Sequence, residues 1–200
     1  MNPTLEYYAA NARNFFDNTF DKEMTAIYER FLPLLPEKGS LLDAGCGSGR
    51  DSRYFLSRGY TVNAFDASKE MAALATDFIG QKVNCLTFDD IDEPKRYDGI
   101  WAAASLLHLP YSELIPTFIH LSHSLKTEGI FYASFKYGCL EYVKDGRHFT
   151  PLDESLTEAL LSEIRHLQLL DIWLTDDLRQ ERKGEIWLNF LAKKVSNEQH

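Results

Sequence analysis

The sequence predicts an α/β protein built on a doubly wound, mostly parallel sheet of seven strands. Three observations lead to this prediction. Short apolar runs alternate with amphipathic stretches over residues 40–167, which is typical of strand–helix–strand units with right-handed crossovers. A turn with three glycines closes the first apolar run. The last two apolar runs flank a polar turn, which indicates an antiparallel hairpin at the end of the sheet.

Two helices are predicted before the sheet, over Leu5–Phe20 and Asp21–Pro36. We expect a single domain over residues 1–200, with an N-terminal helical part (1–38) and a core (39–200). The helical part either forms a lid over the site or only packs against the core, and the sequence leaves both open.

Seven strands are predicted from short runs that are apolar or rich in β-branched and aromatic residues. They are Ser40–Gly45, Tyr60–Asp66, Lys82–Phe88, Tyr97–Ser105, Gly129–Lys136, Leu167–Leu178 and Glu185–Lys194. Residues 137–149 look irregular.

Four amphipathic stretches between these strands predict helices. They are Arg50–Gly59, Ser68–Gly80, Ser112–Leu125 and Thr150–Leu167. Ser68 and Thr150 suit the N-cap position, and Gly80 suits a C-cap. Pro116 is expected near the first turn of its helix, where proline is tolerated.

Composition and charge limit the classes of partner. The chain has 21 Lys and Arg against 30 Asp and Glu, a net charge of -9, which favours a small-molecule substrate over nucleic acid. No apolar run approaches the roughly 18 residues of a membrane span, and no signal peptide is apparent. The three cysteines are far apart, as in reduced thiols of the cytoplasm. We expect a cytoplasmic monomer or homodimer without a membrane partner.

The glycine turn predicts a nucleotide-like ligand at the carboxyl end of the first strand. Its spacing is G-x-G-x-G, and Arg50 stands where a dinucleotide fingerprint has its third glycine, so a ligand with less phosphate is favoured. Asp66 ends the second strand 21 positions after Gly45, where a carboxylate can accept both hydroxyls of a ribose. Asp89 and Asp90 follow the third strand and could meet an adenine amino group.

Five segments in order, "LLDAGCGSG", "NAFDAS", "FDDID", "YDGIWAAASLLHL" and "LKTEGIFYASFK", resemble the motifs of class I S-adenosylmethionine-dependent methyltransferases. The resemblance spans Leu41–Lys136, and the run "GCGSGRDSRYFLSRGYTVNAFDAS" is most similar to the small tellurite-resistance-like members. It implies a Rossmann-like seven-stranded sheet with an antiparallel last strand. It also implies methyl transfer from S-adenosylmethionine to a small molecule, either anionic or a chalcogen species.

The resemblance implies a set of cofactor-binding residues at the strand ends. They are Asp43, Ala44, Gly45, Cys46, Gly47, Arg50, Asp66, Ala67, Ser68, Asp89, Asp90, Ile91, Ala103 and Ala104. Asp43 and the glycine turn would hold the methionine part, Asp66 the ribose hydroxyls and Asp90 the adenine amino group. Ala103 and Ala104 would lie beside the sulfonium.

Methyl transfer from a sulfonium depends more on the alignment of donor and acceptor than on general acid–base catalysis. Candidate catalytic residues are therefore few. His108 follows the fourth strand and is a candidate base, with loop packing as the alternative. Arg147 is a candidate clamp for an anionic acceptor, with a solvated loop as the alternative. Tyr8 could cover the site together with Tyr7 and Phe15, although core packing is an alternative, more so for Phe15.

Other conspicuous residues carry simpler interpretations. Cys46 is expected to serve only as a small residue in the turn. His120 and His123 have no third ligand at a fitting spacing, so we expect no metal site. The tryptophans at 101, 173 and 187 are expected in the core.

Three rival functions stay open. The chain could be a non-catalytic cofactor-binding module, although Asp43, Asp66 and Asp90 are all present. It could methylate protein or nucleic acid, although its acidic balance and the segment "AAASLL" after the fourth strand argue against this. A nicotinamide-dependent oxidoreductase is disfavoured by the glycine spacing.

Overall fold

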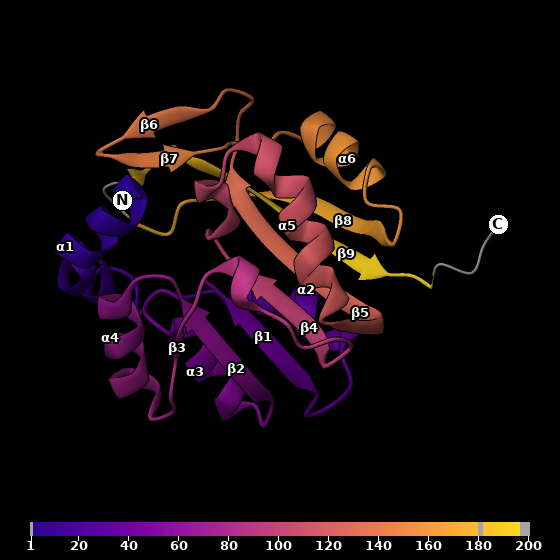
Figure 1. The fold of residues 1–200 in the computed structure, drawn as a ribbon, viewed down its shortest axis with the longest axis horizontal. Helices are drawn as coiled ribbons and strands as arrows, with labels where there is room; N and C mark the ends of the chain where they lie inside the picture. Colours follow the sequence, from indigo (N-terminus) through magenta and orange to yellow (C-terminus); the bar gives the residue numbers. More distant parts are fainter. Residues whose placement is uncertain (1, 180–181, 197–200) are drawn as a thin grey trace.

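Seven strands form one sheet in the computed structural model, which describes residues 2–179 and 182–196 (Figure 1). They are β1 (Ser40–Ala44), β2 (Thr61–Asp66), β3 (Asn84–Cys85), β4 (Tyr97–Ala102), β5 (Leu125–Lys136), β8 (Leu167–Asp176) and β9 (Ile186–Lys194). Their order is β3-β2-β1-β4-β5-β9-β8. Strands β1 to β5 pair in parallel, while β9 runs antiparallel to both β5 and β8. The predicted fold class is confirmed.

Helices cover both faces of the sheet. They are α1 (Pro3–Asp17), α2 (Thr25–Phe31), α3 (Arg50–Ser57), α4 (Lys69–Ile79), α5 (Tyr111–His123) and α6 (Glu154–Ser162). Side chains alternate along each strand, so Val62 packs with Phe31 of α2 and Phe55 of α3, whereas Phe65 belongs to the cluster of α5 and α6. Figure 1 shows α5 and α6 in front of the sheet.

Several details differ from the prediction, and three of the differences have a clear physical reason. Strand β3 is shorter, because a 3₁₀ turn over Phe88–Asp90 replaces its end. Thr150 is not the N-cap of α6, because its hydroxyl donates to the carbonyl of Leu109 (2.5 Å); Asp153 caps the helix instead, accepting from Leu156 N (2.8 Å). Pro116 lies in the second turn of α5, not the first, which removes one helical hydrogen bond.

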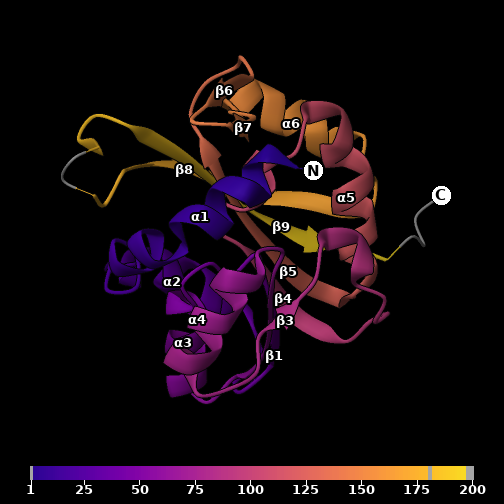
Figure 2. The ribbon, with the colours of Figure 1, turned by 60° about the vertical axis from the view of Figure 1, so that its left-hand side comes forward.

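The segment predicted as irregular contains a hairpin of β6 (Tyr142–Lys144) and β7 (Arg147–Phe149). Asp145 and Gly146 form its turn with φ of 52° and 76°, as a two-residue hairpin turn requires. An Asp-Gly pair is a strong hairpin signal, so the sequence did contain the information. Figure 2 shows this hairpin above α1, on the same side of the molecule as the protruding end of β8 and β9.

Helix α1 crosses the carboxyl ends of the first strands and is anchored on α4. Phe16 of α1 packs edge-on against Phe78 of α4 with ring centroids 5.4 Å apart, and Phe20 packs against both rings. This aromatic contact holds α1 over the edge where ligands bind in doubly wound sheets.

Candidate functional site

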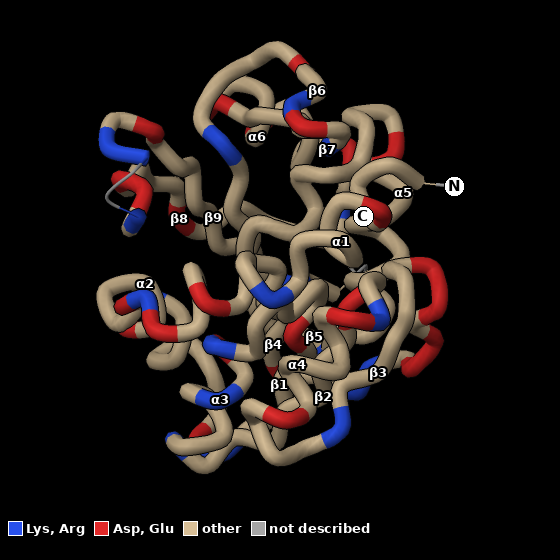
Figure 3. Tube along the Cα trace, turned by 90° about the vertical axis from the view of Figure 1, so that its left-hand side faces the viewer, with Lys and Arg blue, Asp and Glu red and all other residues tan. Residues whose placement is uncertain are grey.

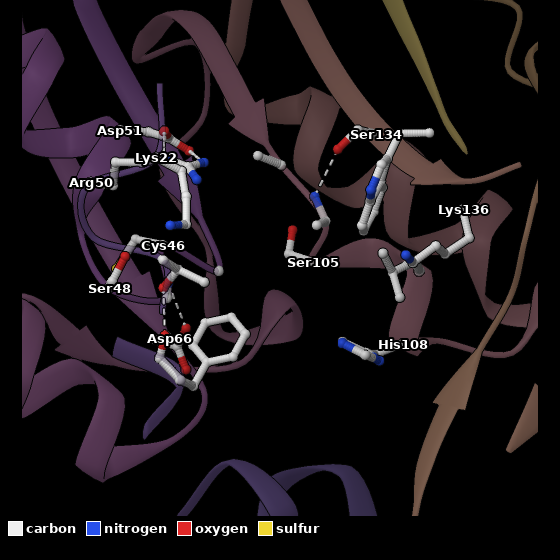
Figure 4. A pocket seen from close by; sticks show the side chains of 18 of the residues that line it. Lys22, Cys46, Ser48, Arg50, Asp51, Asp66, Ser105, His108, Ser134 and Lys136 are labelled. Carbon is white, nitrogen blue, oxygen red and sulfur yellow. Dashed lines mark hydrogen bonds and ion pairs between the residues drawn. The ribbon is translucent and has the colours of Figure 1, made fainter. Parts of the chain in front are cut away.

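A cavity of about 400 Å³ lies at the carboxyl ends of β1, β2 and β4, where the strand order reverses (Figure 4). Helix α1 covers it through Tyr8 and Phe15. The opposite wall comes from β5 and from the hairpin of β8 and β9, including Ser134 and Asn189. The cavity is therefore divided between a half formed by the glycine turn and a half formed by later elements of the chain.

The three turn glycines are needed for different reasons. All have positive φ, which favours glycine: 78° for Gly45, 55° for Gly47 and 78° for Gly49. A Cβ on Gly45 would lie 2.5 Å from Cβ of Ser105, and one on Gly49 would lie 2.7 Å from Cδ1 of Ile79. The nearest atom to a Cβ on Gly47 is Cε1 of Phe15, at 3.4 Å. Close packing therefore leaves no room for a side chain at Gly45 or Gly49, whereas Gly47 faces the cavity and α1.

Asp66 presents an acceptor pair at the end of β2. Its Oδ2 accepts from Gly47 N and its Oδ1 from Ser68 N, both at 2.9 Å. Burial raises the pKa of Asp66, and the two N–H groups partly offset this. Because each carboxylate oxygen has a second lone pair, Asp66 can also accept from two adjacent hydroxyls. Ala67 lines the cavity beside it, whereas Ser68 caps α4 through Met71 N (3.3 Å).

Asp51 organises a buried polar cluster beside the turn. It accepts from Tyr28 Oη (2.5 Å), Trp101 Nε1 (2.8 Å), and Arg50 Nε and Nη2 (2.7 and 3.0 Å). Burial opposes its ionisation, but Arg50 and these donors outweigh burial and lower the pKa of Asp51. Arg50 lines the cavity, so the cluster fixes a guanidinium at its wall.

Asp43 lies beneath the cavity and does not line it. It is 2% exposed and accepts from Ser52 Oγ at 2.6 Å. Burial, reinforced by the nearby charge of Asp51, raises the pKa of Asp43 to about 8. The group is therefore largely protonated at neutral pH.

Asp43→Asn is expected to remove a pH dependence of stability. A carboxyl whose pKa is about 3.9 unfolded and higher folded binds more protons in the folded state. Its stabilising contribution is full below pH 4 and is lost as the pH rises toward 8. Urea unfolding at pH 5 and pH 8.5 should show wild type losing more stability than the variant, by at most a few kcal/mol. Equal losses would contradict a raised pKa at Asp43.

The structure brings together only part of the predicted cofactor set. The predicted residues that line the cavity are Gly45, Cys46, Gly47, Arg50, Asp66, Ala67, Ala103 and Ala104. Ala44 and Ile91 are core side chains. Asp89 and Asp90 lie outside the lining, and the Asp90 carboxylate accepts from N and Oγ1 of Thr87 (both 2.8 Å). Thr87 and Phe88 line the cavity there, which the sequence reasoning missed.

Two cavity residues, Ala104 after β4 and Cys46 in the turn after β1, have unusual environments. Ala104 has φ of 52°, outside the preferred region for a non-glycine residue, and its N–H donates to Ser134 Oγ (2.9 Å). Cys46 is 8% exposed; burial, together with nearby carboxylates, raises the pKa of its thiol well above the ordinary value. The thiol is therefore protonated at neutral pH, which argues against a nucleophilic role.

The three candidate catalytic residues lie close together. Tyr8 Oη is 2.9 Å from His108 Nε2, and His108 Nδ1 is 2.7 Å from the carbonyl oxygen of His148. Because a carbonyl only accepts, Nδ1 carries the hydrogen and Tyr8 donates to Nε2. Burial lowers the pKa of His108 to about 4, so the ring is neutral.

Arg147 is the third member of this group. It is 5% exposed, with its guanidinium 3.9 Å from the Tyr7 ring centroid and 3.3 Å from one Asp145 oxygen. Its buried Nε has no hydrogen-bond acceptor among the described residues. Arg147 therefore lines the cavity as a cation with an unused donor, which suits an anionic ligand.

The far wall contains one of the three tryptophans that the sequence predicts in the core. Trp101 is fully buried, as predicted. Trp187 is partly buried: it packs against the core, and it also lines the cavity and donates to Asp177 Oδ2 (3.0 Å). Trp173 is half-buried: it packs against the core cluster that contains Trp101 and lies under the guanidinium of Arg30 (4.6 Å). Trp173 lies on the edge strand β8, whereas Trp187 lies on β9, between β5 and β8.

The described residues contain neither a metal-binding cluster nor a membrane-spanning helix. Over residues 2–179 and 182–196, no three His, Cys, Asp or Glu side chains are grouped so that they could hold a metal ion. Within the same ranges, none of the helices has the length and apolarity to cross a membrane.

Comparisons with known proteins identify relatives. The family model described as "Methyltransferase domain" matches residues 16–172. A Bacillus subtilis protein named as a methyltransferase, YqeM, is 34% identical over 113 residues. The match covers 51% of this chain and 46% of that protein, about half the length of each.

Solved structures show the same fold. A Burkholderia thailandensis 1,6-didemethyltoxoflavin-N1-methyltransferase, solved with S-adenosylhomocysteine, matches with a TM-score of 0.75 and 21% identity, and the match covers 97% of this chain and 88% of that chain. Magnesium protoporphyrin IX methyltransferase from Synechocystis, solved with S-adenosylmethionine, has TM-score 0.74, 14% identity and coverage of 98% of both chains.

Proposed function

Because the chain belongs to the methyltransferase domain family, we propose that it transfers a methyl group from S-adenosylmethionine to a small-molecule acceptor. One observation carries the proposal. Asp66 lines the cavity at the end of β2 with a lone pair unused on each oxygen, beside a glycine turn that leaves Gly47 open to the ligand. Such a carboxylate suits the two hydroxyls of a ribose.

The residues present fit this cofactor. Asp66 would hold the ribose and the turn backbone the methionine part, with apolar lining from Phe88 and Met71 near the base. Arg50 stands at the same wall and suits a carboxylate. The small side chains Ala103 and Ala104 leave the passage to the acceptor half clear. When bound, S-adenosylmethionine supplies a methyl group on a good leaving group.

The acceptor is proposed to be anionic. Arg147 supports this, because it is a largely buried cation that lines the cavity, and its carboxylate partner Asp145 is 59% exposed. A chalcogen oxyanion belongs to this class and remains part of the proposal. Helix α1 is proposed as a cover that excludes water, since Tyr8 and Phe15 line the cavity from above.

Tyr8 and His108 are proposed to accept the proton of acceptors that must lose one. The acceptor proton would pass to the Tyr8 oxygen while the Tyr8 proton passes to His108 Nε2. A histidine with a pKa near 4 is a weak base, so this route serves only acceptors whose own proton is acidic.

Tyr8→Phe is expected to lower kcat about tenfold or more for acceptors that carry a proton to lose. For acceptors that are already anionic, kcat should change little, since no base is needed. Release of S-adenosylhomocysteine, measured with both kinds of acceptor, checks this. Tyr7→Phe is the matched control, because Tyr7 packs on Arg147 outside the cavity lining. Equal losses for both acceptor kinds would point to a steric role for Tyr8.

Calorimetry with S-adenosylhomocysteine, followed by a release assay over thiols, oxyanions, carboxylates and phenols, tests the proposed function. We expect binding and turnover on at least one anionic acceptor. Absence of binding would refute the cofactor assignment. Binding without turnover on any acceptor would favour a non-catalytic cofactor-binding module, and turnover on protein or nucleic acid alone would refute the small-molecule assignment.

A further inference from the structure

A second cavity, of about 290 Å³, lies between the hairpin of β6 and β7 and the end of the hairpin of β8 and β9. It adjoins the first cavity, because four residues line both: Lys136, Arg147, Phe149 and Arg182. Figure 3 shows that basic positions occur on both hairpins, at the same end of the molecule. The two cavities therefore form one continuous region on the acceptor side.

The second cavity is strongly basic in an acidic protein. Among the described residues that line it, four are cationic and one is acidic: Lys136, Lys144, Arg147 and Arg182 against Glu185. The chain as a whole has a net charge of -9. A local excess of cations against that background raises the concentration of anions at this place.

The acidic groups nearby do not fully neutralise these cations. Lys136 pairs with Glu185 and, at 3.4 Å, with Asp177, so its charge is balanced. Glu185 is shared with Arg182, which lies 3.8 Å away. Asp145 pairs with Arg147 at 3.3 Å but is itself 59% exposed. Lys144 is exposed and has no ion-pair partner within the part of the chain that the structure describes.

Arg147 links the two cavities. Its buried side chain lines both, and its Nε lacks an acceptor among the described residues. The rings of Tyr7 and Phe149, with centroids 3.9 and 5.3 Å from the guanidinium carbon, hold the group in place. The guanidinium thus adds a fixed positive charge to the wall that the two cavities share.

We infer that the second cavity is an anion subsite, which binds a carboxylate or phosphate carried by the methyl acceptor away from the methylated atom. The acceptor is then bipartite: its reacting part lies in the first cavity beside Tyr8, and its anionic part lies between the two hairpins. The inference rests on the proposed function only for the identity of the reacting part. The subsite itself depends on the basic cluster.

Calorimetry on protein saturated with S-adenosylhomocysteine tests the subsite with three probes: phenyl phosphate, phenylacetate and the neutral benzyl alcohol. Both anions are expected to bind at least tenfold more tightly than the alcohol, and more weakly as salt rises. Tighter binding of phenyl phosphate than of phenylacetate would indicate that the natural acceptor carries a phosphate. Tighter binding of phenylacetate would indicate a carboxylate.

Variants locate the binding. Lys144→Gln changes an exposed residue that lines only the second cavity, so folding should be preserved, and we expect anion binding to weaken about threefold or more. Arg147→Met should weaken it at least tenfold. Lys82→Gln makes the same charge change at an exposed position outside both cavities and should have no effect.

The inference is overturned if the anions bind no more tightly than the alcohol, or if Lys144→Gln and Lys82→Gln behave alike. A different outcome is that the protein does not bind S-adenosylhomocysteine but does bind the anions, and that Lys144→Gln weakens this anion binding. That outcome would support the subsite and refute the proposed function. The two failures are thus distinguishable.

Discussion

Gly45→Ala is expected to destabilise the fold by about 2–5 kcal/mol. Its φ of 78° costs an alanine about 1–2 kcal/mol. The new Cβ would also lie 2.5 Å from Cβ of Ser105, and overpacking of this kind costs about 1–3 kcal/mol. Ser105 cannot simply rotate away, because the clash is with its Cβ and its hydroxyl donates to the Ala44 carbonyl (2.6 Å). Urea unfolding measures the change.

Gly80→Ala is the matched control. Gly80 has φ of 74°, but a Cβ there meets no atom within 4 Å, so only the backbone cost applies, about 1–2 kcal/mol. In addition, Ser105→Gly should recover part of the stability lost in Gly45→Ala, since it removes the clashing atom. If Gly45→Ala and Gly80→Ala lower the free energy of unfolding by the same amount, the close contact with Ser105 does not contribute to the loss.

Asp66→Ala is expected to weaken S-adenosylhomocysteine binding by about a hundredfold or more. Hydrogen bonds to a charged acceptor are each worth about 1.5–3 kcal/mol, and two hydroxyls would lose theirs. The variant also frees the N–H groups of Gly47 and Ser68, which loosens the turn. Isothermal titration calorimetry gives the change in affinity, and circular dichroism checks that the sheet is retained.

Asp90→Ala tests whether Asp90, like Asp66, contributes to cofactor binding. Its carboxylate is exposed and caps the short helix over Phe88–Asp90, outside the cavity lining. We expect less than a threefold change in S-adenosylhomocysteine affinity. Indifference to Asp66→Ala, or a larger effect of Asp90→Ala, would contradict the ribose assignment.

Much of the fold was predictable because its signals are local. Alternating apolar runs, glycine stops such as Gly80 and the N-cap Ser68 each act within a few residues, and all reappear in the structure. One error, at the start of α6, arose where a distant partner competes. Thr150 has a good N-cap side chain, but Leu109, 41 residues away, takes its hydroxyl.

The cofactor half of the site was predictable to a similar extent. Gly47 and Asp66 belong to one turn and the strand beside it, so their spacing along the chain sets their spacing in space. Asp43 shows the limit of this reasoning, since its position at the end of β1 did not reveal that it is buried beneath the cavity.

By itself, the sequence determined the strands, the antiparallel end of the sheet and the acidic acceptor beside the glycine turn, because strand positions, turn geometry and strand ends follow from local chemistry. Only the tertiary structure decided which side chains meet in the acceptor half. Tyr8, His108 and Arg147 are up to 139 positions apart, and their contacts depend on how α1 and the β6–β7 hairpin pack. The local sequence pattern does not predict such long-range packing, and it does not predict the burial that keeps His108 neutral.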